Sequence, residues 1–150
     1  MKLQTSTRLA IFAVLELAAG EGHQLSVAAI GEKYDVSSHH LAKVMNDLAR
    51  AGIVRAARGA GGGYQFTGNA RRLTLLDVIE RFEELGSVEV ASSSATPEFK
   101  ALNEVLDEID EIARATLGSI TIATMRKLVD RHRSGNMTAS KARDKGRHRS

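Results

Sequence analysis

Residues 35–66, DVSSHHLAKVMNDLARAGIVRAARGAGGGYQF, decide the fold. Four apolar residues in this stretch recur at the spacing of one helix face: Leu41, Val44, Met45 and Leu48. Ser37 is suited to cap the start of this helix, and Gly52 can end it in a left-handed conformation. The other helical positions are polar or small. The pattern therefore predicts a helix with one buried face and one polar outer face.

Two short strands are predicted after this helix, at residues 53–57 and 63–66, around a glycine-rich loop. Before it, Ser26 can cap a short helix that ends at Tyr34, and residues 35–36 form a tight connection. A short helix, a short turn and a longer helix are the signature of a helix-turn-helix, and the hairpin is then its wing. The predicted fold class is mainly α with a small β-wing: a winged helix-turn-helix followed by a long C-terminal helix.

The composition is typical of a globular chain, with 43% apolar and 26% charged residues. The sequence contains no apolar run long enough to span a membrane, no signal-peptide pattern and no cysteine, so a cytoplasmic protein is expected. Residues 1–72 have a net charge of +4, residues 73–133 of −5, and residues 134–150 of +4. The basic first segment suggests contact with a polyanion, although a chance imbalance of solvated faces gives the same values.

The order of elements resembles that of the IscR/NsrR family of bacterial regulators. The similarity covers about residues 1–130 and includes the opening MKLQTSTRLAIFAVLELA and the segment VRAARGAGGGYQF, which resembles the wing of that family. The segment HHLAKVM is more similar to the NsrR branch, because Ala42 stands where the IscR branch has an acidic residue. The resemblance implies a homodimeric transcriptional regulator, more often a repressor, bound to a pseudo-palindromic operator.

The chain departs from this family at the cofactor. Members that sense iron, redox state or nitric oxide hold an iron–sulfur cluster through three cysteines in the loop before the long helix. The corresponding residues 90–96 are VASSSAT, and Arg8 stands near the position of an aspartate ligand in some relatives. No cluster is expected, and whether the loss is natural or engineered stays open. The input is then a partner protein, a small ligand between the wing domain and the dimer helices, or none.

A recognition helix binds the major groove through its amino-terminal side chains, and a wing can contact the minor groove. Residues 5–8 begin a first helix over residues 5–19, where they could cap the helix or hold a phosphate. The predicted DNA contacts are Thr5, Thr7 and Arg8 there; Ser26, Ser37, Ser38, His39, His40, Lys43, Asn46 and Arg50 on the helix-turn-helix; and Arg55, Arg58, Gly59, Gly61, Gly62 and Tyr64 on the wing.

Other kinds of site find little support in the sequence. The glycine-rich loop lacks the lysine and the following helix of a phosphate-binding loop. His39 and His40 diverge by about 100° on a helix and have no suitably spaced acidic partner, so a metal site is not predicted. No enzyme motif is present, and no catalytic residue is proposed. A winged-helix module that binds another protein instead of DNA is the main alternative.

Residues 1–85 are predicted to form the DNA-binding domain, which includes a helix capped by Thr74. Residues 86–97 should be a flexible loop, residues 98–133 a dimerisation helix and a short final helix, and residues 134–150 a basic disordered tail. A long amphipathic helix after such a domain usually dimerises, although it could fold back on its own domain. The predicted dimer contacts are Leu102, Val105, Leu106, Ile109, Ile112 and Ile120.

Overall fold

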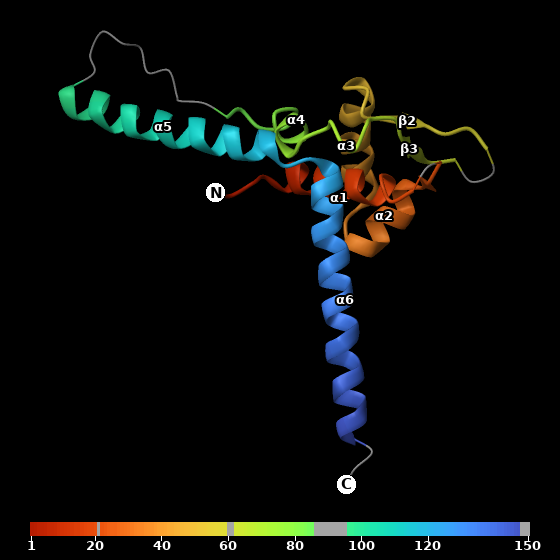
Figure 1. Cartoon of the computed structure of the whole chain (residues 1–150). Helices are drawn as coiled ribbons and strands as arrows, with labels where there is room; N and C mark the ends of the chain where they lie inside the picture. Colours follow the sequence, from red (N-terminus) through yellow and green to blue (C-terminus); the bar gives the residue numbers. More distant parts are fainter. Residues whose placement is uncertain (21, 60–61, 86–95, 148–150) are drawn as a thin grey trace.

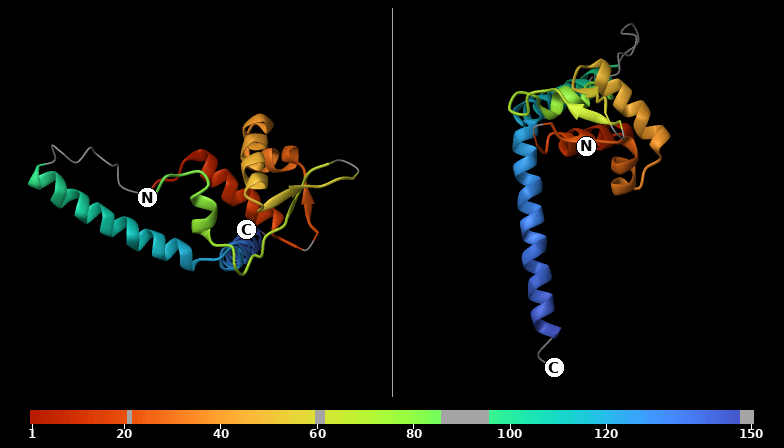
Figure 2. Two further views of the ribbon diagram at one scale, coloured as in Figure 1. Left: turned by 90° about the horizontal axis from the view of Figure 1, so that it is seen from above. Right: turned by 90° about the vertical axis from the view of Figure 1, so that its right-hand side faces the viewer.

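Two long helices leave a helical N-terminal unit in different directions in the computed structural model (Figures 1 and 2). The long helices are α5 (Pro97–Ser119) and α6 (Ile122–Arg147). The N-terminal unit comprises four helices and a small sheet: α1 (Thr5–Leu17), α2 (Val27–Tyr34), α3 (Ser38–Arg50), α4 (Leu75–Ile79), β1 (Gln24–Leu25), β2 (Val54–Ala56) and β3 (Tyr64–Phe66). Seen from above, α5 and the hairpin of β2 and β3 lie on opposite sides of the unit (Figure 2). The structure describes residues 1–20, 22–59, 62–85 and 96–147, without the side chains of residues 139–147.

The first helix, α1 (Thr5–Leu17), is the centre of the packing, because α3, α4, α6 and β3 all lie against it. Its apolar side chains cover more than one side, and a helix of this kind is stable only when other elements surround it. Its buried apolar residues are Leu9, Ala10, Ile11, Ala13, Val14 and Leu17. The sequence prediction of a buried first helix is thereby confirmed.

The helix-turn-helix consists of α2 (Val27–Tyr34) and α3 (Ser38–Arg50). Ser26 Oγ accepts a hydrogen bond from the Ala29 N–H at 3.1 Å and so caps α2, as predicted. At the turn, the Val36 N–H donates to the Gly31 carbonyl at 2.9 Å, and a Cβ on Gly31 would lie 2.8 Å from the Val36 carbonyl oxygen. The two helices can therefore approach at this angle only with glycine at position 31.

The third helix has the predicted start, end and buried face. Ser37 Oγ accepts from the His40 N–H at 3.3 Å, and Gly52 follows the helix in a left-handed conformation with a φ of 73°. The Ile53 N–H donates to the Leu48 carbonyl, and the Gly52 N–H to the Ala49 carbonyl, which is the Schellman motif. The four stripe residues are at most 2% exposed: Leu41, Val44, Met45 and Leu48.

The sheet has three antiparallel strands in the order β1-β3-β2, rather than the two that the sequence predicts. β2 (Val54–Ala56) and β3 (Tyr64–Phe66) form the predicted hairpin. The additional strand β1 (Gln24–Leu25) pairs with β3. Two residues are too few to show an alternating pattern, and this strand exists only because a distant strand offers its free edge.

Helix α4 (Leu75–Ile79) begins with a capping box. Thr74 Oγ1 accepts from the Asp77 N–H at 3.2 Å, and the Asp77 carboxylate accepts from the Thr74 N–H at 2.9 Å. The helix packs between α1 and α5. It therefore connects the N-terminal unit to the first of the two long helices.

The junction of α5 and α6 is fastened to the segment before α4. The Leu75 N–H donates to the Ile120 carbonyl at 2.9 Å, and the Ile122 N–H donates to the Leu73 carbonyl at 2.8 Å. Ile120 is half-buried against the core, so its prediction as a dimer contact is not supported. The reason is that α5 ends at Ser119 and the chain turns back toward its own core there.

The predictions of a short final helix and a disordered tail are wrong, because α6 continues as one helix from Ile122 to Arg147. Residues 134–147 contain no proline, and extending an existing helix avoids the cost of nucleation. Most of the predicted flexible loop, residues 86–95, lies outside the described residues. No helix in the described part of the chain is long and apolar enough to cross a membrane.

Replacing Gly31 with Ala tests the close approach at the turn. Since the Cβ would meet backbone rather than a movable side chain, we expect urea denaturation to show a loss of about 1–3 kcal/mol in the free energy of unfolding. Gly20→Ala is the matched control, because nothing lies within 4 Å of a Cβ added there. Equal losses in the two variants would contradict the account of the turn.

Candidate nucleic-acid interface

The outer face of α3 carries the polar residues that the sequence assigns to DNA contact. Burial of the apolar stripe turns the opposite side of the helix to solvent. Five predicted contacts are exposed on this side or at the amino end: Ser38, His39, Lys43, Asn46 and Arg50. These side chains offer hydrogen-bond donors and acceptors of the kinds that bind base edges and phosphates.

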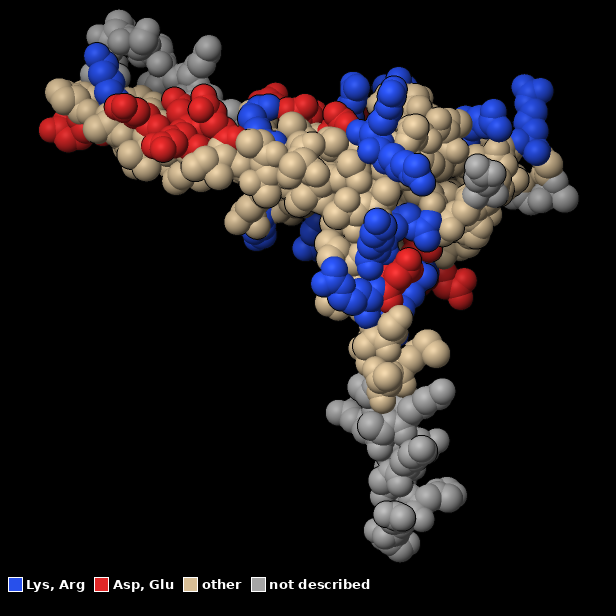
Figure 3. Space-filling view, viewed as in Figure 1, with Lys and Arg blue, Asp and Glu red and all other residues tan. Residues whose placement is uncertain are grey.

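Basic side chains gather over α3 and the hairpin, whereas acidic side chains gather along α5 (Figure 3). Further basic side chains surround the first turns of α6 in the same view. The segment charges of the sequence thus correspond to different regions of the molecule. A polyanion is attracted to the N-terminal unit and repelled by α5.

Three polar side chains lie in a row on the outer face of the sheet and help to position the wing. They are called here the polar row: Gln24, Gln65 and Arg55. The Arg55 guanidinium donates to Gln65 Oε1, with nitrogen–oxygen distances of 3.1 and 3.4 Å. Gln24 Nε2 donates to the Gly62 carbonyl at 2.7 Å. These bonds orient Arg55 and hold one end of the glycine loop. Sequence reasoning did not find the two glutamines, although Gln65 alternates with two aromatic residues along its strand.

Four predicted wing contacts are exposed: Arg55, Arg58, Gly59 and Gly62. Gly61 lies outside the described residues. Tyr64 is different, because it lies on the other face of β3 from Gln65 and is half-buried against the core. The structure therefore does not place the Tyr64 ring beside Arg55 for a DNA contact.

The amino end of α1 is bound by a carboxylate of the same chain. Glu83 Oε1 accepts from the Thr7 hydroxyl at 2.8 Å and from the Gln4 N–H at 2.6 Å. Thr7 is completely buried. A phosphate at this hydroxyl would have to displace Glu83, so the predicted DNA contact by Thr7 is not supported. Thr5 and Arg8 are exposed and remain candidates.

Three further predicted contacts have structural partners. His40 is half-buried, and its Nε2 lies 3.1 Å from Ser6 Oγ, so it joins the start of α3 to the start of α1. The hydroxyls of Ser26 and Ser37 cap α2 and α3. A side chain in this position can still contact a phosphate with its free lone pairs or with the neighbouring backbone N–H groups.

Comparison with known proteins identifies the family. Residues 3–127 match the model of the Rrf2 family, described as an iron-dependent transcriptional regulator. The chain belongs to the Rrf2 family. It is 48% identical over 134 residues to BadM of Rhodopseudomonas palustris, named as a candidate HTH-type transcriptional regulator; the alignment covers 89% of this chain and 86% of BadM.

Solved structures of Rrf2-type regulators have the same fold. CymR, the global cysteine regulator of B. subtilis, has a TM-score of 0.73 at 26% identity, covering 85% of this chain and 98% of that one. IscR of T. potens has a TM-score of 0.65 at 28% identity, covering 86% and 88%. The IscR/NsrR resemblance and the winged-helix fold class are confirmed. As an Rrf2 protein, the chain is a DNA-binding transcriptional regulator and not an enzyme.

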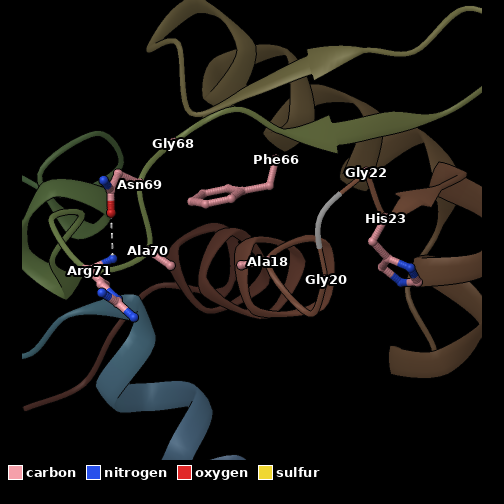
Figure 4. Close-up of a pocket in the computed structure, with 9 residues that line it drawn as sticks. All are labelled: Ala18, Gly20, Gly22, His23, Phe66, Gly68, Asn69, Ala70 and Arg71. Atoms are coloured by element: carbon pink, nitrogen blue, oxygen red, sulfur yellow. Dashed lines mark hydrogen bonds between the residues drawn. The ribbon is translucent and has the colours of Figure 1, made fainter.

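The structure of this Rrf2 chain also contains an open pocket of about 570 Å³ beside the sheet (Figure 4). Its lining comes mostly from turns and small residues, with the Phe66 ring between His23 and Arg71 in the view of Figure 4. Gly68 lies close to that ring, since a Cβ added there would be 2.8 Å from its tip. In the described part of the chain, no group of three or more His, Asp or Glu residues is placed to hold a metal ion.

Thr7→Val tests the structural role of this hydroxyl in the Rrf2 chain. The variant removes a hydrogen bond to a carboxylate, so we expect the free energy of unfolding to fall by about 1–3 kcal/mol. The salt dependence of DNA binding should not change, because Thr7 does not reach the surface. Thr5→Val, at an exposed position, is the control for stability. A stable Thr7→Val variant whose salt slope falls would restore Thr7 as a phosphate contact.

Proposed function

We propose that the chain is a homodimeric, sequence-specific repressor that inserts two α3 helices into successive major grooves of a pseudo-palindromic operator. The observation that carries this proposal is the separation of faces on α3, with a stripe at most 2% exposed and a polar side open to solvent. Helices with such an exposed face fit the major groove, and dimers bind half-sites about one helical turn apart. Repression is proposed from the resemblance to IscR and NsrR regulators.

The wing would contact the neighbouring backbone or minor groove. Arg58 is exposed beside the glycine loop, and Arg55 is oriented by Gln65. Glycines let a backbone approach a phosphate closely, and arginine is the side chain that most often enters a narrow minor groove. A protein-binding winged helix without DNA contact remains the alternative, and the basic surface over α3 and the wing argues against it (Figure 3).

The homodimer is proposed from the exposed apolar residues of α5, called here the α5 stripe: Leu102, Val105, Leu106, Ile109 and Ile112. They are 46–61% exposed. A contiguous apolar patch of this kind is uncommon on a monomer and usually marks an interface. Covering five such side chains contributes on the order of 5 kcal/mol. A second α5 supplies the same stripe and closes the interface by two-fold symmetry.

An iron–sulfur cluster does not fit the residues of this chain. Clusters of this kind are held mainly by cysteine thiolates, and the chain contains no cysteine. We therefore propose that this regulator controls DNA binding without a cluster, although the family is described as iron-dependent. Its input is then a ligand or partner that binds one arrangement of the two long helices better than another.

Lys43→Ala and Arg58→Ala test the two DNA contacts. Each variant should weaken binding to a promoter fragment by about tenfold, because each removes a charged contact. The slope of log affinity against log salt should fall by about one for each lost phosphate contact. Fluorescence anisotropy over a salt series measures both quantities.

Lys100→Ala is the matched control, since it removes one charge near the start of α5 (Pro97–Ser119), a helix that extends away from α3 and the wing (Figure 1). Its salt slope should equal that of the wild type. If all three variants bind the promoter fragment with equal affinity and equal salt slope, α3 and the wing are not the DNA-binding surface. The alternative of a winged helix that binds another protein is then favoured.

Ile109→Asp tests the dimer, because it places a charge in the middle of the α5 stripe. Sedimentation velocity should show a monomer at micromolar concentration where the wild type is a dimer, since an unpaired carboxylate is costly to bury. Lys100→Asp places a carboxylate on the exposed opposite side of α5 and should remain dimeric. A dimeric Ile109→Asp variant, or a monomeric wild type, would contradict the proposed interface.

A further inference from the structure

A cavity of about 340 Å³ lies between α1, the end of α2 and α6. Apolar side chains from α1 and α6 line most of it: Phe12, Leu15, Met125 and Val129. At about 30 Å³ per water molecule, this volume holds roughly ten non-hydrogen atoms. The size and lining are those of a small-molecule site.

Two stacked aromatic rings form one wall of this cavity. The ring centroids of Phe12 and Tyr34 are 4.9 Å apart, with an angle of 13° between the ring planes. The Tyr34 hydroxyl donates to Glu16 Oε1 at 2.7 Å, which fixes the orientation of the ring. Burial, followed by the hydrogen bond to Glu16, raises the pKa of Tyr34 well above its usual range, so this side chain stays neutral.

The five charged residues that line the cavity have a net charge of +1. Burial alone would raise the pKa of Glu16, but hydrogen bonds from Lys33 and Tyr34 and the charges of Lys33 and Arg133 lower it below its usual value. The ion pair with Lys33 neutralises this carboxylate. The other three charged lining residues are Arg126, Asp130 and Arg133.

Arg133 supplies the positive charge that is open to a ligand. Arg126 is occupied, because its guanidinium donates to the Ala18 carbonyl. In the described part of the chain, the Arg133 guanidinium makes no hydrogen bond or ion pair with another residue. It is exposed, and it lines the cavity together with apolar and aromatic side chains.

We propose that this cavity binds a small organic monoanion, a carboxylate with an apolar body of roughly ten non-hydrogen atoms. The apolar body lies against the stacked rings and Val129, and the carboxylate meets Arg133. The ligand is the signal to which the regulator responds. This last step rests on the proposed function.

The position of the cavity explains how occupancy changes DNA binding. Tyr34 is the last residue of α2 and directly precedes the turn to α3. Val129 and Arg133 belong to α6, which continues from α5 through the junction at Ile120. A ligand that touches both sides favours one placement of α6 against the helix-turn-helix, and so one spacing of the two α3 helices in a dimer.

Calorimetric titration of the full chain with octanoate tests the site. Octanoate should bind saturably at one site per chain, and 1-octanol, which lacks the charge, should bind about tenfold more weakly. Arg133→Ala should weaken octanoate by about the same factor and leave 1-octanol unchanged. Val129→Trp should abolish both by filling the cavity, with the melting temperature as its check on folding.

Arg131→Ala is the matched control, because Arg131 is exposed two residues away and does not line the cavity. It should bind octanoate like the wild type. Absence of saturable binding to the wild type, equal affinity for octanoate and 1-octanol, or equal weakening by the two arginine variants would overturn the site.

A second measurement separates this inference from the proposed function. Saturating octanoate should change the affinity of the wild type for a promoter fragment by at least about fivefold, the low end of allosteric coupling. Unchanged affinity in a protein that binds both octanoate and DNA overturns the signalling role. If the protein without octanoate does not bind the promoter fragment, the proposed function is contradicted instead. The octanoate binding result then still holds.

Discussion

Burial of the α3 stripe against α1 is the constraint on which the rest of the structure depends. Leu41, Met45 and Leu48 are completely buried, and this leaves one orientation of α3 about its own axis. The polar side then faces solvent. The Schellman motif after the helix sends the chain directly into β2, so the wing lies beside the same face. Core packing thus orients two surface features, the polar side of α3 and the exposed part of the wing.

The junction of α5 and α6 transmits this arrangement to the long helices. Backbone hydrogen bonds from Leu75 and Ile122 fasten the junction to the segment around α4, and α4 itself packs on α1. A dimer formed through α5 therefore fixes the separation of two N-terminal units as well as joining them. The cavity lies between α6 and the same α1. The α3 helix, the proposed dimer helix and the proposed ligand site are thus all connected to α1, directly or through α4.

Local signals in the sequence were sufficient for most of the fold. The caps at Ser26, Ser37 and Thr74 and the left-handed Gly52 all depend on residues within a few positions, and each is found as predicted. The bond between Thr7 and Glu83 spans 76 residues, and strand β1 exists only through its pairing with β3. The periodicity of apolar residues along the chain gives no information about such distant hydrogen-bond partners. Ile120 was assigned to the apolar face of α5, but α5 ends at Ser119. The cavity was not predicted either, because its lining comes from helices that are distant in the sequence.

The proposed complex has two α3 helices in successive major grooves of one DNA site. Dimethyl sulfate protection tests it most directly, because the reagent methylates guanine N7, which lies in the major groove. The experiment uses the wild-type protein on a promoter fragment selected by binding from the source genome. We expect two clusters of protected guanines with centres about 10 base pairs apart. Retention of the fragment without protected guanines, or with a single cluster, would contradict it.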